Sequence, residues 1–132
     1  MKLLLVFVVM AFPSIGRAAA FQYECTIRQV VSLDAGKANI RSDGYEVGRK
    51  FSVSRESGAM SGFIDWRRQE GSWKMYQVVD RGSKNQSFKL LLMPEPAPYT
   101  RIMYLEVKEF EQTPEKTFTY YDTFKLLTGM CL

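Results

Sequence analysis

The stretch FQYECTIR (residues 21–28) decides the fold of this 132-residue chain. Apolar and polar residues alternate along it, so an apolar residue recurs at every second position. This is the period of a β-strand with one buried face. The stretch also contains Cys25, and the second of the two cysteines, Cys131, is the penultimate residue of the chain. We therefore expect an opening strand that is linked covalently to the last segment.

Cys25 and Cys131 are predicted to form a disulfide. Two cysteines in an exported domain usually pair, and the close C-x-x-C spacing of a redox-active pair is absent. On the chain-entropy model, a crosslink that closes about a hundred residues stabilises a fold by about 4–5 kcal/mol. Such a bridge also requires Cα atoms within about 7 Å of each other. The first and last segments of the domain should therefore be neighbours.

The first twenty residues have the features of a signal peptide. Lys2 precedes an apolar run at residues 3–12, and three alanines at residues 18–20 supply the small side chains that a signal peptidase accepts. The apolar run is about half as long as a bilayer span. We predict that residues 1–20 are a bacterial signal peptide and residues 21–132 a single domain. This domain would be periplasmic or secreted, without membrane insertion after cleavage.

Removal of the leader changes the net charge of the protein. Two of the 18 Lys and Arg residues, Lys2 and Arg17, lie in the leader, so the mature domain has 16 of them against 14 Asp and Glu. The resulting net charge of +2 is too small to indicate a nucleic-acid partner. A domain of this size buries roughly two thirds of its unfolded surface in one core. We expect a monomer that binds no nucleic acid.

The rest of the chain consists mainly of strand patterns. Residues 34–44 are expected to form a loop, and no segment favours more than a short helix near residues 122–127. The predicted fold class is therefore all-β, either a small antiparallel barrel or a two-sheet sandwich of about seven or eight strands. The pattern leaves barrel and sandwich open. The further strands are expected within residues 49–55, 73–79, 87–93, 99–110, 117–121 and 124–131.

The composition argues against an enzyme. The chain has no histidine, which removes Ser-His-Asp and Cys-His nucleophilic systems and the commonest metal ligand. Both cysteines are expected in the disulfide, so a thiolate nucleophile or zinc ligand is not available. Carboxylate pairs remain, but Glu106 and Glu109 fall on opposite faces of one predicted strand. We predict a protein that is not an enzyme and that needs no metal or cofactor.

Two groups of residues are candidate binding sites. The first combines a predicted hairpin loop with an aromatic and guanidinium turn of the type enriched in protein interfaces, although packing of the tryptophans in the core is an alternative. The second is a set of tyrosines that would line a ligand mouth, although tyrosine is also an ordinary strand residue. The first group consists of Ser57, Gly58, Met60, Trp66, Arg67, Arg68 and Trp73. The second group consists of Tyr99, Tyr104, Tyr120 and Tyr121.

These groups lead to two functional hypotheses. The first is an exported binding module that contacts a protein partner, or inhibits it, through loop residues. The second is a lipocalin-like carrier of a small apolar ligand, suggested by the many Phe, Tyr, Met and Leu residues. The interior of an eight-stranded barrel holds at most one small molecule, so the size of the inward side chains decides between the two.

Three short features resemble one known family. Tyr23-Glu24-Cys25, Ser57-Gly58-Ala59 and the terminal cysteine are similar to the small periplasmic inhibitors of c-type lysozyme. In that family a disulfide-bonded β-barrel presents a Ser-Gly loop to the lysozyme cleft. The likeness covers a few residues only, and Met60-Ser61-Gly62 stands where the family carries a tyrosine. A glycine in a plain hairpin turn explains Ser57-Gly58 better, so the sequence assigns no family.

Overall fold

The computed structural model describes residues 21–34, 36–64, 75–93, 102–123 and 125–132. These ranges contain nine β-strands, all paired antiparallel, and no helix that is long and apolar enough to cross a bilayer. The strands are β1 (Gln22–Asp34), β2 (Lys37–Arg41), β3 (Lys50–Ser54), β4 (Met60–Gly62), β5 (Met75–Ser83), β6 (Gln86–Met93), β7 (Met103–Val107), β8 (Lys116–Asp122) and β9 (Lys125–Cys131).

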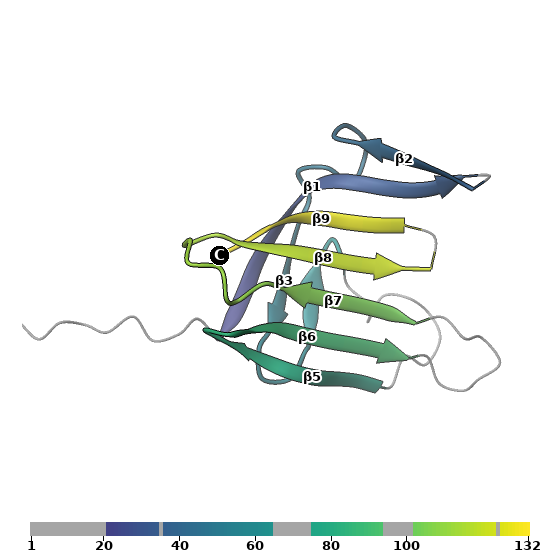
Figure 1. Cartoon of the computed structure of the whole chain (residues 1–132). Helices are drawn as coiled ribbons and strands as arrows, with labels where there is room; N and C mark the ends of the chain where they lie inside the picture. Colours follow the sequence, from purple (N-terminus) through teal and green to yellow (C-terminus); the bar gives the residue numbers. More distant parts are fainter. Residues whose placement is uncertain (1–20, 35, 65–74, 94–101, 124) are drawn as a thin grey trace, which may run out of the picture.

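Eight of the strands form a curled sheet in the order β4-β3-β1-β9-β8-β7-β6-β5, and β2 pairs with β1 beside this path (Figure 1). The predicted all-β class is confirmed, and the architecture is an antiparallel half-barrel rather than a sandwich. One local prediction is wrong, because residues 34–44 contain β2 in place of a plain loop. Near residues 122–127 the sequence allowed at most a short helix; there Asp122 ends β8, Lys125 begins β9, and the two strands pair directly.

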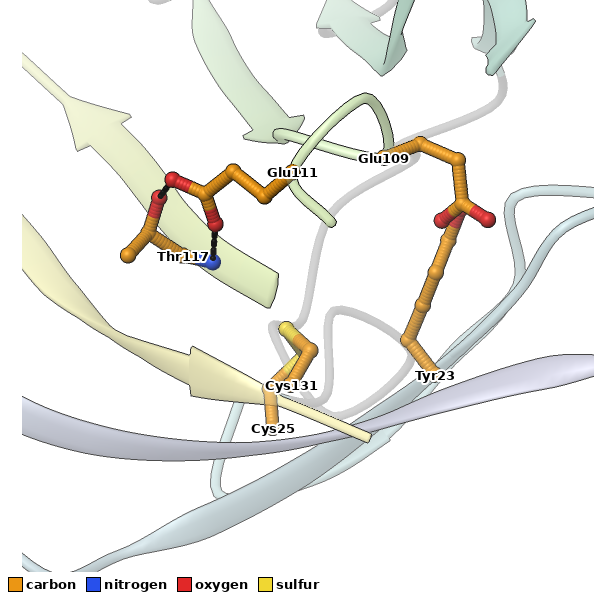
Figure 2. Close-up of a disulfide and its surroundings, with 6 residues drawn as sticks. All are labelled: Tyr23, Cys25, Glu109, Glu111, Thr117 and Cys131. Atoms are coloured by element: carbon orange, nitrogen blue, oxygen red, sulfur yellow. Dashed lines mark hydrogen bonds between the residues drawn. A yellow bond between two sulfur atoms is a disulfide. The ribbon is translucent and has the colours of Figure 1, made fainter. Parts of the chain in front are cut away.

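The predicted disulfide between Cys25 and Cys131 is confirmed (Figure 2). The two cysteines are directly opposite on β1 and β9, and their Cα atoms are 3.9 Å apart. The neighbouring pair, Glu24 and Leu132, exchanges two backbone N–H···O bonds of 3.1 and 2.9 Å. The cysteines therefore occupy a non-hydrogen-bonded position of the ladder, where facing side chains come closest.

The concave face of the half-barrel is filled by one hydrophobic core. Aromatic rings connect its two sides: Tyr23 lies 5.3 Å from Phe88, and Phe51 lies 5.2 Å from Phe118 in an edge-to-face arrangement. These contacts join β1 and β3 to β6 and β8, which are separated in the sheet. The curl of the sheet is thus held by side chains that meet across its concave face.

β1 is bent, and its two halves pair with different strands. Its first half, up to Thr26, pairs with β3, and its second half, from Val30, pairs with β2. The register with β9 shifts between Ile27 and Gln29, and such a bulge bends the strand. Opposite the bulge, Gly129 is required because an added Cβ would overlap the carbonyl oxygen of Thr26.

Candidate functional site

The loop at residues 55–59 joins β3 to β4 and contains part of the first predicted group. Ser57 and Ala59 are exposed, whereas Gly58 is buried. Met60 is the first residue of β4 and is 2 % exposed, because alternate residues of a strand point to opposite faces and Met60 points to the core. Of the predicted loop residues, Ser57 alone is therefore accessible to a partner.

The backbone of the 55–59 loop is held by its own polar groups. The backbone N–H of Ser57 donates to Ser54 Oγ at 3.2 Å, and that of Ala59 donates to Ser57 Oγ at 3.2 Å. In addition, the N–H of Gly58 donates to the carbonyl of Ser54 at 2.9 Å. Gly58 has a φ of 74°, which disfavours other residues. The exposed tip therefore has one preferred conformation.

Gly58 also packs the loop against the far side of the half-barrel. A Cβ at this position would overlap the side chain of Leu90 on β6 and lie 3.3 Å from Cγ2 of Val78 on β5. The loop thus connects the β3–β4 edge of the sheet to the β5–β6 edge. A methyl group here would push the loop away from the core.

Gly58→Ala is therefore expected to lower the free energy of unfolding by about 1–3 kcal/mol, measured by urea denaturation. The matched control is Gly48→Ala, because Gly48 has a similar φ of 82° but no atom within 4 Å of an added Cβ. The control gives the free-energy cost of placing alanine at a positive φ. The difference between the two variants therefore gives the cost of the steric overlap with Leu90. Equal losses in both variants would contradict the packing role.

Three side chains clamp the loop to the rest of the fold. Arg55 Nη1 lies 3.5 Å from Glu109 Oε1, and the hydroxyl of Tyr23 donates to Glu109 Oε2 at 2.7 Å (Figure 2 shows Tyr23 and Glu109). The guanidinium of Arg55 lies 5.1 Å from the centre of the Tyr23 ring, and its Nη2 donates to the carbonyl of Arg81 at 3.4 Å. This Tyr23-Arg55-Glu109 cluster joins β1, the loop and the segment that follows β7.

The Tyr23 hydroxyl stays protonated in this cluster. Burial raises the pKa of Tyr23 well above its ordinary value, and the hydrogen bond to Glu109 raises it further. A protonated hydroxyl donates to a carboxylate, so the pair is a stable contact at neutral pH. The cluster therefore has the properties of a structural clamp.

The described members of the predicted tyrosine group lie on two different faces of the sheet. Tyr120 is 4 % exposed in the core, and its hydroxyl donates to Sδ of Met103 at 3.0 Å. Tyr104 and Tyr121 are directly paired on β7 and β8 and lie on the opposite, outer face, with Tyr121 44 % exposed. Tyr99 lies outside the described residues. The sequence pattern contained Tyr104 and Tyr121 but not their pairing, which depends on the register of two strands.

The predicted aromatic and guanidinium turn, at residues 66–68 and 73, also lies outside the described residues. Another cluster of aromatic rings and a guanidinium group lies within the described residues. The guanidinium of Arg49 lies 5.0 Å from the ring centre of Tyr45 and 6.0 Å from that of Phe63, and the two rings are 5.5 Å apart. This cluster was not predicted from the sequence, and Phe63 joins Tyr45 and Arg49 only through the fold.

The loop before β3 is attached to the β8–β9 hairpin by an ion pair. Lys125 Nζ donates to Glu46 Oε1 at 3.0 Å, and the carboxylate of Glu46 is largely shielded from solvent, with 12 % of its side chain exposed. The hydrogen bond from Lys125 lowers the pKa of Glu46, and the nearby charge of Arg41 contributes. The charged carboxylate is therefore the form that the folded protein prefers.

Glu46→Gln is expected to destabilise the protein more at pH 7 than at pH 3. A carboxyl whose folded pKa is depressed stabilises the fold above its ordinary pKa of 4.5, and this contribution disappears as the pH falls through the folded value. Urea unfolding at both pH values tests this, with Glu56→Gln at an exposed position as the control. A loss of stability that is the same at both pH values would contradict the ion-pair explanation.

Among the residues that the structure describes, no group of three or more His, Cys, Asp and Glu side chains is arranged to hold a metal ion. Comparison of the chain with family models, curated proteins and solved structures finds no match. The site that the geometry defines best is the clamped 55–59 loop.

Proposed function

We propose that the protein is an exported binding module that contacts a protein partner through the 55–59 loop, in the manner of a loop-presenting inhibitor. The observation that carries the proposal is the combination of a fixed backbone and an exposed tip. Gly58 is buried against Leu90, and Arg55 is paired with Glu109, while the residues between and beside them face solvent.

A fixed loop binds more tightly than a mobile one of the same composition. Association costs the entropy of every loop residue that becomes ordered, and a loop that is already ordered avoids this cost. The backbone hydrogen bonds to Ser54 and Ser57 order the 55–59 loop before any partner is met. Glu56 and Ser57 at the tip are then the residues that a partner would contact first.

Two further observations support the proposal. The Cys25–Cys131 disulfide favours an oxidising compartment, in agreement with an exported protein. Large side chains occupy the concave face, and Phe51, Phe88 and Phe118 are among its fully buried residues. Inward residues of this size favour a binding module over the alternative function as a carrier of a small apolar ligand.

The proposal is tested by capturing partners with the native protein and with Glu56→Arg. Glu56 is exposed, and reversing its charge is expected to weaken binding of a loop-specific partner at least tenfold, as measured by surface plasmon resonance with the captured protein. The control is Gln112→Arg, an exposed position in the loop between β7 and β8. A partner that binds Glu56→Arg and the native protein equally well would contradict the assignment of the loop.

A direct inhibition assay tests one class of partner. The resemblance of Tyr23-Glu24-Cys25 and Ser57-Gly58 to inhibitors of c-type lysozyme suggests measuring cell-wall lysis by a c-type lysozyme with increasing amounts of the protein. Inhibition that is lost in Glu56→Arg would identify the enzyme class. An unchanged rate of lysis at a large excess of the protein would remove this class from the proposal.

A further inference from the structure

β2 is an edge strand that pairs with the second half of β1. β2 (Lys37–Arg41) pairs with β1, and it has no other strand partner among the described residues. Figure 1 shows β2 at the margin of the sheet, and all five of its residues are exposed. Because the polar groups of a strand alternate between its two sides, about half of the N–H and C=O groups of β2 point away from β1. These groups can pair with an additional strand.

The two faces of β2 differ in chemistry. Lys37, Asn39 and Arg41 lie on one face, and Ala38 and Ile40 lie on the other. Ile40 is 64 % exposed although it is a large aliphatic residue. An added strand would therefore meet two cations on one side and an apolar surface on the other.

Ile40 is the last member of an apolar row across the outer face of the sheet. Direct cross-strand pairs connect each member to the next, so the row runs over six strands. All its members except Ile40 have a core residue as a neighbour in the sequence. The row ends at the free edge, so an apolar residue of an added strand would extend it. The row consists of Leu91, Tyr104, Tyr121, Leu126, Val31 and Ile40.

A second copy of the chain is a poor occupant of this edge. Two β2 strands that pair antiparallel about a two-fold axis at Asn39 would place Lys37 of one copy opposite Arg41 of the other. Like charges directly opposite each other destabilise a strand pair, and cationic residues on an edge are a common protection against self-association. The same charges attract an acidic strand.

We propose that the free edge of β2 binds an extended segment of a partner protein as an additional antiparallel strand. The segment has acidic residues on the face of Lys37 and Arg41 and apolar residues on the face of Ile40. Backbone hydrogen bonds to β2 supply affinity, and the alternating side chains supply specificity. Both cations lie on the edge strand itself, which has no acidic residue of its own.

Two acidic residues near β2 belong to neighbouring segments of this chain. Asp34 on β1 is the register partner of Lys37, and Glu46, which is near Arg41, is already bonded to Lys125. Asp43 is exposed in the turn that follows β2. This surface adjoins the second half of β1, whereas the 55–59 loop extends from β3 beside the first half. The two binding surfaces are therefore separate, and either proposal can fail without the other.

The test uses a short synthetic peptide of alternating Glu and Val, with blocked ends, and the disulfide-bonded ¹⁵N-labelled protein. Titration should shift the amide signals of β2 and of the paired part of β1. The double variant Lys37→Glu/Arg41→Glu should weaken the binding at least tenfold and should bind the corresponding Lys-Val peptide instead. Ile40→Asn, which keeps the charges, should also weaken the binding of the Glu-Val peptide.

Three outcomes would overturn the proposal. The first is the absence of shifts at β2, and the second is equal binding of the Glu-Val and Lys-Val peptides by the native protein. The third is a native dimer in sedimentation velocity that Ile40→Asn dissociates, because the occupant would then be a second copy. The control Lys50→Glu/Lys84→Glu changes the net charge equally at exposed positions away from β2 and should leave the binding unchanged.

Discussion

Replacement of both cysteines, Cys25→Ala together with Cys131→Ala, should lower the free energy of unfolding by about 2–5 kcal/mol. The disulfide joins positions 106 residues apart, so its loss releases nearly the whole domain in the unfolded state. Both cysteines are also buried, and alanine leaves the space of two sulfur atoms unfilled. The fold should persist, because the ladder between β1 and β9 continues beyond the disulfide to Ser32.

Urea denaturation measures the effect in the absence of reductant. A reducing agent should destabilise the native protein by a similar amount and leave the double variant unchanged, because the variant has no disulfide to lose. The mutation acts mainly on the unfolded state, so the cost should not depend on the identity of the small replacement, and serine should behave like alanine to within the cost of burying its hydroxyl. A native protein that is insensitive to reductant would contradict the assigned role of the disulfide.

Phe118→Ala is expected to cost about 3–5 kcal/mol. Phe118 is 1 % exposed, and its ring lies 5.2 Å from the ring of Phe51, in an edge-to-face arrangement across the core. The ring also packs against β9 at Gly129. A Cβ at position 129 would lie only 2.7 Å from Phe118 Cε1, so the ring fits there because the residue is glycine. Neighbouring side chains cannot collapse into the vacated space easily, since the backbone of β9 forms one of its walls.

Urea denaturation with Phe110→Ala as the control tests this prediction. Phe110 is 42 % exposed in the loop after β7, so removing its ring should change the free energy of unfolding by about 0.5 kcal/mol or less. The difference between the two variants isolates the contribution of burial from that of the amino-acid change. Similar values for both would show that the concave core does not hold the two sides of the half-barrel together.

The candidate site was only partly predictable from the sequence. The loop at Ser57 and Gly58 was identified, because a Ser-Gly pair between two strand patterns indicates a hairpin turn. The inward position of Met60 was missed, since alternation shows that successive residues point to opposite faces but does not show which face is the core. The contacts of Gly58 with Leu90 and Val78 come from strands of the other edge, and no local pattern contains them.

The partners of Arg55 show the same limit at longer range. Glu109 and Tyr23 are far from Arg55 in the chain. The local sequence around each of them gives no sign of a contact with Arg55. The apolar row that ends at Ile40 could not be predicted either, although Tyr104 and Tyr121 belong to the tyrosine group proposed from the sequence as a ligand mouth. A row across six strands exists only when the registers of all the strand pairs are known.

The sequence by itself determined the class of the fold and its covalent closure. The alternation in FQYECTIR predicts a strand with one buried face, and a disulfide between Cys25 and Cys131 requires the two strands that carry them to be neighbours. The tertiary structure decided the half-barrel, the clamp on the 55–59 loop and the free edge of β2. The physical reason is that strand periodicity is a local property, whereas register, sheet curvature and the choice of edge strands arise from pairings between distant segments.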